Sequence, residues 1–151
     1  MINLHKLLAT FFGIGYIGKG GGTIAAAFIC ILWLLIPNTV LIVQLQMIVT
    51  GLVLFAGVWS GNVVEQVWGK DDNKVVIDEV AGMLITLVFV PVNFAYVITG
   101  LVLFRFFDIV KPLFIKKMEL FPGGWGVMAD DLLAGLYARG VLMLIIEYKL
   151  Y

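Results

Sequence analysis

Residues 80–104 read VAGMLITLVFVPVNFAYVITGLVLF and contain no charged side chain. A helix that spans a bilayer needs about 20 residues, so this apolar run is too long for one helix. Pro91 lacks a backbone N–H donor, and Asn93 favours a turn. We therefore expect the run to divide into two helices that meet at VPVN, residues 90–93.

The composition points to a membrane protein. Of the 151 residues, 62% are hydrophobic and 13% are charged, whereas soluble domains have about 45–50% and about 25%. A soluble chain of this length could not bury so many apolar side chains, because too much of a small fold is surface. The net charge is zero, and the motifs of nucleic-acid-binding proteins are absent. These features favour an integral membrane protein and argue against a nucleic-acid partner.

Three further apolar runs cover Thr23–Ile36, Val40–Trp59 and Leu132–Ile146, the last interrupted by Arg139. With the two halves of the run around Pro91, they predict an all-α fold. We expect a polytopic membrane helix bundle that forms a single domain over residues 1–151. The five membrane segments are expected near residues 22–36, 40–60, 78–90, 93–110 and 128–148.

The charges predict which end of this bundle faces the cytoplasm. The turns around Pro37 and Pro91 carry no charge, whereas the N-terminal segment, the 61–77 loop and the 105–130 loop carry most of the lysines and carboxylates. Positive residues are retained on the cytoplasmic side of a membrane. We therefore expect these three segments to form one polar cap on the cytoplasmic face of the membrane.

Three acidic clusters lie in this predicted cap: KDDNKVVIDEVAGM at 70–83, FRFFDIVKP at 104–112 and GGWGVMADDLLAG at 123–135. Each has a plain structural explanation, because acids stabilise helix N-termini and the charges of the second cluster share one helix ridge. Three such clusters at one membrane face favour a common site instead. Carboxylates at membrane depth are costly unless they are paired or bound to a metal, and hard oxygen ligands suit Mg²⁺.

The residue inventory limits the chemistry of such a site. Ser60 is the only serine and His5 the only histidine, which excludes a Ser-His-Asp triad and argues against a zinc site built on histidine and cysteine. Hydrolysis at the predicted cap would therefore need a metal-activated water or a carboxylate nucleophile.

The blocks VVIDEVAG, FRFFDIVKP and GGWGVMADDLLAG, in this order and spacing, resemble the signature blocks of the phosphatidylglycerophosphatase A family of membrane phosphatases. The resemblance covers residues 12–136. Members of that family remove the terminal phosphate of the lipid phosphatidylglycerophosphate to give phosphatidylglycerol in phospholipid biosynthesis, and they need Mg²⁺. The resemblance thus implies an Mg²⁺-dependent lipid phosphatase with this substrate.

The resemblance also implies roles for individual residues. The expected catalytic residues are Asp78, Glu79, Asp108, Asp130 and Asp131. The expected metal ligands are Asp71, Asp78, Glu79, Asp130 and Asp131. The expected substrate-binding residues are Lys19, Thr23, Arg105 and Lys111. We interpret three other acids as solvated loop charges, namely Glu65, Asp72 and Glu119, and we leave Arg139 outside the site.

The glycine-rich stretch FGIGYIGKGGGT, residues 12–23, resembles two nucleotide-binding patterns but fits neither. The residues that follow are apolar where a dinucleotide-binding fold needs an acid, and Gly20 stands where a phosphate loop needs a hydroxyl. The family's early block usually reads like P-G-T-x-G-S, and Gly22 and Thr23 keep its Gly-Thr pair. We interpret the stretch as a cradle for the lipid phosphate, because glycine backbone at a helix N-terminus can approach an anion closely. A flexible entry to the first membrane helix is the alternative interpretation.

A cation- or proton-coupled transporter is the alternative function, because intramembrane acids are typical of transporters. The acids gather at one predicted face and form no path across the bilayer, which favours the phosphatase. A scaffold subunit whose acids only cap helices is a third possibility.

Overall fold

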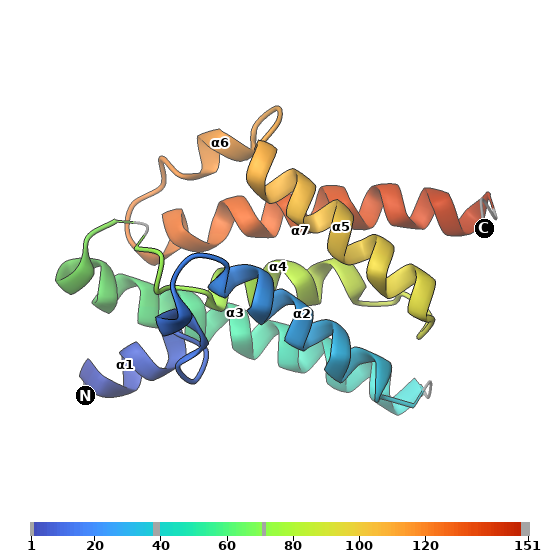
Figure 1. Ribbon diagram of the computed structural model, residues 1–151, viewed down its shortest axis with the longest axis horizontal. Coiled ribbons are helices and arrows are strands. Elements are labelled where there is room, and N and C mark those ends of the chain that lie inside the picture. Colours follow the sequence, from blue (N-terminus) through green and yellow to red (C-terminus); the bar gives the residue numbers. More distant parts are fainter. Residues whose placement is uncertain (1, 38–39, 71, 149–151) are drawn as a thin grey trace.

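The computed structural model describes residues 2–37, 40–70 and 72–148, and within these ranges the regular structure is entirely helical (Figure 1). The all-α fold expected from the sequence is therefore confirmed. The elements are α1 (Ile2–Ala9), the 3₁₀-helix η1 (Ile14–Ile17), α2 (Gly21–Leu34), α3 (Val40–Trp68), α4 (Ile77–Leu87), α5 (Phe94–Val110), α6 (Ile115–Met118) and α7 (Gly124–Glu147).

The apolar run at 80–104 divides where the sequence predicts. α4 ends at Leu87 and α5 begins at Phe94, with Pro91 in the connection. The side chain of Asn93 caps α5, because its Oδ1 accepts hydrogen bonds from the backbone N–H groups of Ala95 and Tyr96 at 2.8 and 3.4 Å. This cap satisfies donors that have no partner inside the helix.

The expectation of about five membrane segments is not confirmed by the helix lengths. In the part of the chain that the structure describes, one helix is long and apolar enough to cross a membrane, over Gln44–Trp68 of α3. α2, α4 and α5 have 14, 11 and 17 residues, fewer than the roughly 20 that a span requires. The predicted segment 128–148 overlaps α7 up to its end at Glu147, and the apolar sequence of α7 is interrupted by Asp130, Asp131 and Arg139. The five predicted segments do coincide with five helices, namely α2, α3, α4, α5 and α7.

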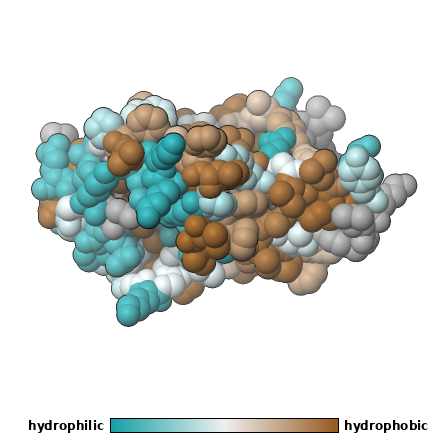
Figure 2. All heavy atoms as spheres, turned by 90° about the horizontal axis from the view of Figure 1, so that it is seen from above, coloured by the Kyte–Doolittle hydropathy of each residue, from teal (hydrophilic) through white to brown (hydrophobic). Residues whose placement is uncertain are grey.

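The molecule is elongated, and its polar and apolar side chains are separated along the long axis. Figure 2 shows hydrophilic side chains concentrated at the left end, whereas much of the middle and right of this face is hydrophobic. In Figure 1 the same end carries α1, α6 and the start of α7. The expected polar cap therefore exists as a structural feature of the helix bundle.

The short helix α4 lies at the centre of the packing. It contacts α2, α3, α5 and α7, and nine of its 11 residues are buried. Val80, Met83 and Leu87 are fully enclosed and belong to one apolar core. A helix that is apolar around most of its circumference requires such burial on all sides, and this explains why α4 is surrounded by the other elements.

α4 and α7 cross at two glycines. A Cβ atom on Gly135 would lie 2.4 Å from the carbonyl oxygen of Gly82, and one on Gly82 would lie 2.7 Å from the carbonyl oxygen of Asp131. The hydroxyl of Thr86 donates a hydrogen bond to the Gly82 carbonyl at 2.9 Å and lies 3.4 Å from the Gly135 carbonyl. The two backbones can approach this closely because neither glycine has a side chain.

We expect Gly82→Ala to lower the free energy of unfolding by roughly 1–3 kcal/mol, the usual cost of forcing extra volume into a packed core. The new Cβ would meet the ring of Phe104 and the backbone of α7. Thermal or denaturant unfolding of the purified protein measures the effect. The control is Gly140→Ala in α7, where a Cβ would meet no atom within 4 Å and helix propensity predicts a gain of up to about 1 kcal/mol. Equal changes in both variants would contradict the proposed role of the crossing.

Candidate active site

A polar cavity of about 180 Å³ lies beside the first turns of α2 and α4, the end of α5 and the first half of α7. Four separate segments of the chain therefore contribute to it. Its lining comprises residues 18–22, Asp72, Asn73, Val75, Asp78, Glu79, Arg105, Asp108, Lys111, Asp130 and Asp131.

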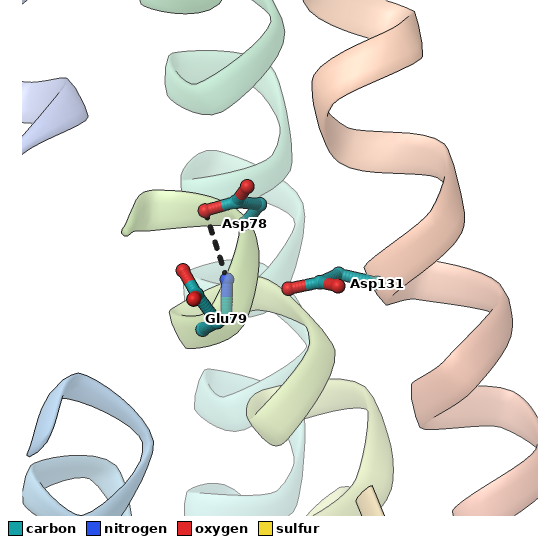
Figure 3. A group of neighbouring side chains, drawn as sticks. All are labelled: Asp78, Glu79 and Asp131. Carbon is teal, nitrogen blue, oxygen red and sulfur yellow. Dashed lines mark hydrogen bonds between the residues drawn. The ribbon is translucent and has the colours of Figure 1, made fainter. Parts of the chain in front are cut away.

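Three carboxylates converge in this cavity. One oxygen each from Asp78, Glu79 and Asp131 lie within 4.8 Å of one another, and Figure 3 shows the Asp131 side chain pointing from α7 toward the two acids of α4. Asp78 and Asp131 are only 8% and 3% exposed. Asp78 Oδ1 accepts a hydrogen bond from the backbone N–H of Glu79 at 3.1 Å. Burial and mutual repulsion both disfavour three ionised carboxylates at this spacing, and a bound cation would offset both effects.

The donor set fits a hard divalent cation. Carboxylate oxygens are the protein ligands that Mg²⁺ prefers, and one carboxylate oxygen is available from each of three residues. Glu79 Oε2 is buried and accepts no hydrogen bond from any described residue. Among the ligands expected from the sequence, Asp78, Glu79 and Asp131 therefore come together, whereas Asp71 lies outside the described residues.

Basic side chains face these acids across the cavity. Arg105 forms an ion pair with Asp108 three residues further along α5, at 2.5 Å, and its guanidinium lies 3.7 Å from Glu79. Within the described part of the chain, the Arg105 Nε atom is buried and donates no hydrogen bond. Lys19 also lines the cavity and is exposed. The cavity thus places fixed positive charge beside the carboxylate cluster.

Lys111 links two parts of the polar cap. Its ammonium group donates hydrogen bonds to Asp130 at 2.6 Å and to Glu119 at 2.7 Å. Partial burial alone would lower the pKa of Lys111, but the hydrogen bonds to these two carboxylates outweigh it and raise the pKa. Lys111 is the C-cap of α5 and has a left-handed backbone conformation, with φ of 46°. That turn directs the chain back across the cavity toward α6.

A close approach between α2 and α4 places Glu79. A Cβ atom on Gly22 would lie 1.7 Å from Glu79 Oε1, so only glycine leaves room for this carboxylate against the first turn of α2. Gly20 is the N-cap of α2 and provides no side chain to accept from the first N–H groups. The start of α2 therefore presents backbone to the cavity, as the sequence predicts for the glycine-rich stretch.

Two other residues considered in the sequence analysis do not line the cavity. Thr23 follows the two buried glycines of α2, but its side chain is exposed and does not line the cavity. Glu65 also lies outside the cavity lining.

Two acids interpreted as solvated loop charges have specific positions in the structure. Glu119 binds Lys111. Asp72 lines the cavity, and it also accepts hydrogen bonds from the backbone and the ammonium of Lys74 at 2.9 and 3.1 Å. Slight burial opposes these bonds, but they lower the pKa of Asp72 overall. The sequence signal for Asp72 was its proximity to Asp78, whereas nothing local to Glu119 indicated its partner.

Comparisons with known proteins agree with this chemistry. The family model for phosphatidylglycerophosphatase A matches residues 7–146. Phosphatidylglycerophosphatase A of Escherichia coli is 35% identical over 148 residues, covering 96% of this chain and 85% of that protein. The Haemophilus influenzae protein of the same name is 32% identical over 151 residues, covering 98% and 91%.

A third relative has a different name. A Bacteroides thetaiotaomicron protein, provisionally named as a phosphatidylinositol-3-phosphatase, is 45% identical over 142 residues, covering 89% of both chains. No solved structure gives a significant match.

The helical fold, the acid-and-base cavity and these matches define an enzyme that hydrolyses phosphoric monoesters. Within that class, the chain belongs to the phosphatidylglycerophosphatase A family. The match to phosphatases gives no support to the transporter alternative.

We expect Lys111→Met to lower the free energy of unfolding by about 1–3 kcal/mol, because a buried acceptor that loses its charged donor retains its desolvation cost. The affected acceptor is Asp130, which is 6% exposed. Denaturant unfolding measures the loss. The control is Lys116→Met, which changes an exposed lysine in the same connection and should stay within about 0.5 kcal/mol of the parent. If the two variants are equally stable, Lys111 does not hold the cap together.

Proposed function

We propose that this protein is an Mg²⁺-dependent lipid phosphatase that converts phosphatidylglycerophosphate to phosphatidylglycerol and phosphate in phospholipid biosynthesis. The observation that carries the proposal is the cluster of Asp78, Glu79 and Asp131 facing Arg105 and Lys111 in one cavity, in a chain of this phosphatase family. A phosphomonoester carries nearly two negative charges, which must be neutralised before a nucleophile can approach the phosphorus.

The three clustered carboxylates would hold Mg²⁺, with Asp130 beside them in the same cavity. Mg²⁺ bound there supplies positive charge that stabilises the oxygens of a transferring phosphoryl group. A bound metal would also explain a cluster of like charges that otherwise repel one another, since two of the three acids are buried and Arg105 lies near only Glu79 among them.

The basic residues would bind the phosphate oxygens. Arg105 suits this role because its guanidinium offers several donors in one plane, and its ion pair with Asp108 orients it. The close ion pair favours a positioning role for Asp108 over a role as general base. Lys111 and Lys19 add charge from two further sides of the cavity, and the first N–H groups of α2 favour an anion at the helix N-terminus.

The membrane arrangement is also part of the proposal. We place the polar cavity at the cytoplasmic face of the bacterial inner membrane, because the basic residues concentrate at that end of the bundle. α3 would cross the bilayer, and the shorter apolar helices would pack beside it within the membrane. The acyl chains of the substrate would then stay in the bilayer while the headgroup enters the cavity.

We expect Asp78→Asn, Asp108→Asn and Asp131→Asn each to reduce phosphate release at least about a hundredfold. Asp78 and Asp131 would bind the metal, and Asp108 would orient Arg105 toward the phosphate. Phosphate release from phosphatidylglycerophosphate in mixed micelles, with Mg²⁺ or with a chelator, measures this. Glu65→Gln is the control, since Glu65 lies outside the cavity. Full activity in all three variants, or full activity with the chelator, would disprove the assigned site or its metal.

The Bacteroides relative supports a second substrate of the same chemical kind, a phosphatidylinositol monophosphate. Rates for phosphatidylglycerophosphate, phosphatidylinositol 3-phosphate, phosphatidic acid and lysophosphatidic acid should be compared on one preparation. We expect the highest kcat/KM for phosphatidylglycerophosphate. A higher kcat/KM for the inositol lipid would reassign the substrate without changing the site. Ion flux into proteoliposomes without any phosphate release would instead favour the alternative function, a transporter.

A further inference from the structure

A second cavity lies outside the active site. It is an open groove of about 350 Å³ between α2, α3 and α4, with a lining that is almost wholly apolar. Its lining includes Trp33 of α2, Val49 and Val53 of α3, and Val80 of α4. Because α3 is the helix that can cross a membrane, the groove opens toward the hydrocarbon region in the proposed arrangement.

The groove and the polar cavity are lined by neighbouring parts of the same chain segments. The connection between α1 and α2 lines the groove at Phe11 and the polar cavity at residues 18–20. In α4, Glu79 faces the polar cavity and the adjacent Val80 faces the groove. Two chain segments therefore border both spaces, and each changes from polar to apolar contact within a few residues.

One helix, α2, lines both spaces. Gly22 lies at the polar cavity and Trp33 lines the groove. A helix rises about 1.5 Å per residue, so these positions are separated by roughly 16 Å along the axis. A phosphate at the start of α2 would leave an acyl chain that runs beside the same helix to the level of Trp33.

We propose that this groove binds one acyl chain of the phospholipid substrate and so fixes the headgroup in the polar cavity. The inference rests on the proposed function and adds a binding subsite to it. A chain that moves from bilayer to groove gains little from leaving water, because it was already in an apolar environment. Its contribution is orientation, since a held chain presents the phosphate to Arg105 and the acidic cluster in a limited set of positions.

The test narrows the groove with Val49→Trp. The control is Leu52→Trp, which adds the same side chain at another exposed position of α3 that does not line the groove. We expect Val49→Trp to lower kcat/KM about tenfold for dioleoyl phosphatidylglycerophosphate, the effect of a modest loss of orientation. Diacetyl substrate, whose acyl groups are too short to extend along the groove, should be unaffected. If Val49→Trp and Leu52→Trp leave the same ratio of long-chain to short-chain kcat/KM, the groove does not bind the chain.

A second measurement does not depend on catalysis. Phosphatidylglycerol with a photoreactive diazirine at the end of one acyl chain should crosslink to the peptide that contains Trp33 or to the facing turns of α3. Val49→Trp should abolish this crosslink, and Leu52→Trp should keep it. Crosslinks spread evenly over the exposed apolar residues, as from the same probe with a phosphatidylcholine headgroup, would show annular lipid only and overturn the proposal. Localised crosslinks without lipid phosphatase activity would retain the groove and refute the proposed function.

Discussion

The close contact of α4 and α7 at Gly82 and Gly135 determines where the polar residues of this protein meet. Each glycine lies four residues, about one helical turn, after an acid: Asp78 precedes Gly82, and Asp131 precedes Gly135. The sequences DEVAG and DLLAG therefore place an acid one helical turn before a glycine on both helices. Where the glycines allow the backbones to touch, the acids one turn away must face each other across a narrow space. The packing that stabilises the bundle is thus also what forces like charges together.

Other elements place basic side chains beside these acids. α5 brings Arg105 against Glu79 and holds it with Asp108, while the residue after α5 brings an ammonium to Asp130. α2 contributes a glycine where any side chain would displace Glu79. The cavity therefore combines acids and bases from four segments, and a phosphatase can use it because its substrate is strongly charged.

Much of this arrangement could be predicted from the sequence, because helix positions follow from local patterns. Pro91 and Asn93 set the boundary between α4 and α5, and the acids adjoining the apolar runs marked the candidate site. The span count is not confirmed, because hydropathy does not reveal that α4 has only 11 residues and is covered by protein on nearly all sides. The exposure of Thr23 depends on the rotation of α2 about its axis, and the role of Glu119 depends on a contact with Lys111 across the cap. No local motif indicates the exposure of Thr23 or the role of Glu119.

The backbone at Lys111 has a further consequence for how this chain can change. A left-handed conformation is tolerated most easily by glycine, and other L-residues pay of order 1 kcal/mol or more to adopt it. Replacement by glycine would relax the end of α5 and remove the ammonium from between two carboxylates. Backbone preference and charge therefore act in opposite directions at this position. The two hydrogen bonds that the Lys111 ammonium donates offset the conformational cost of the left-handed turn.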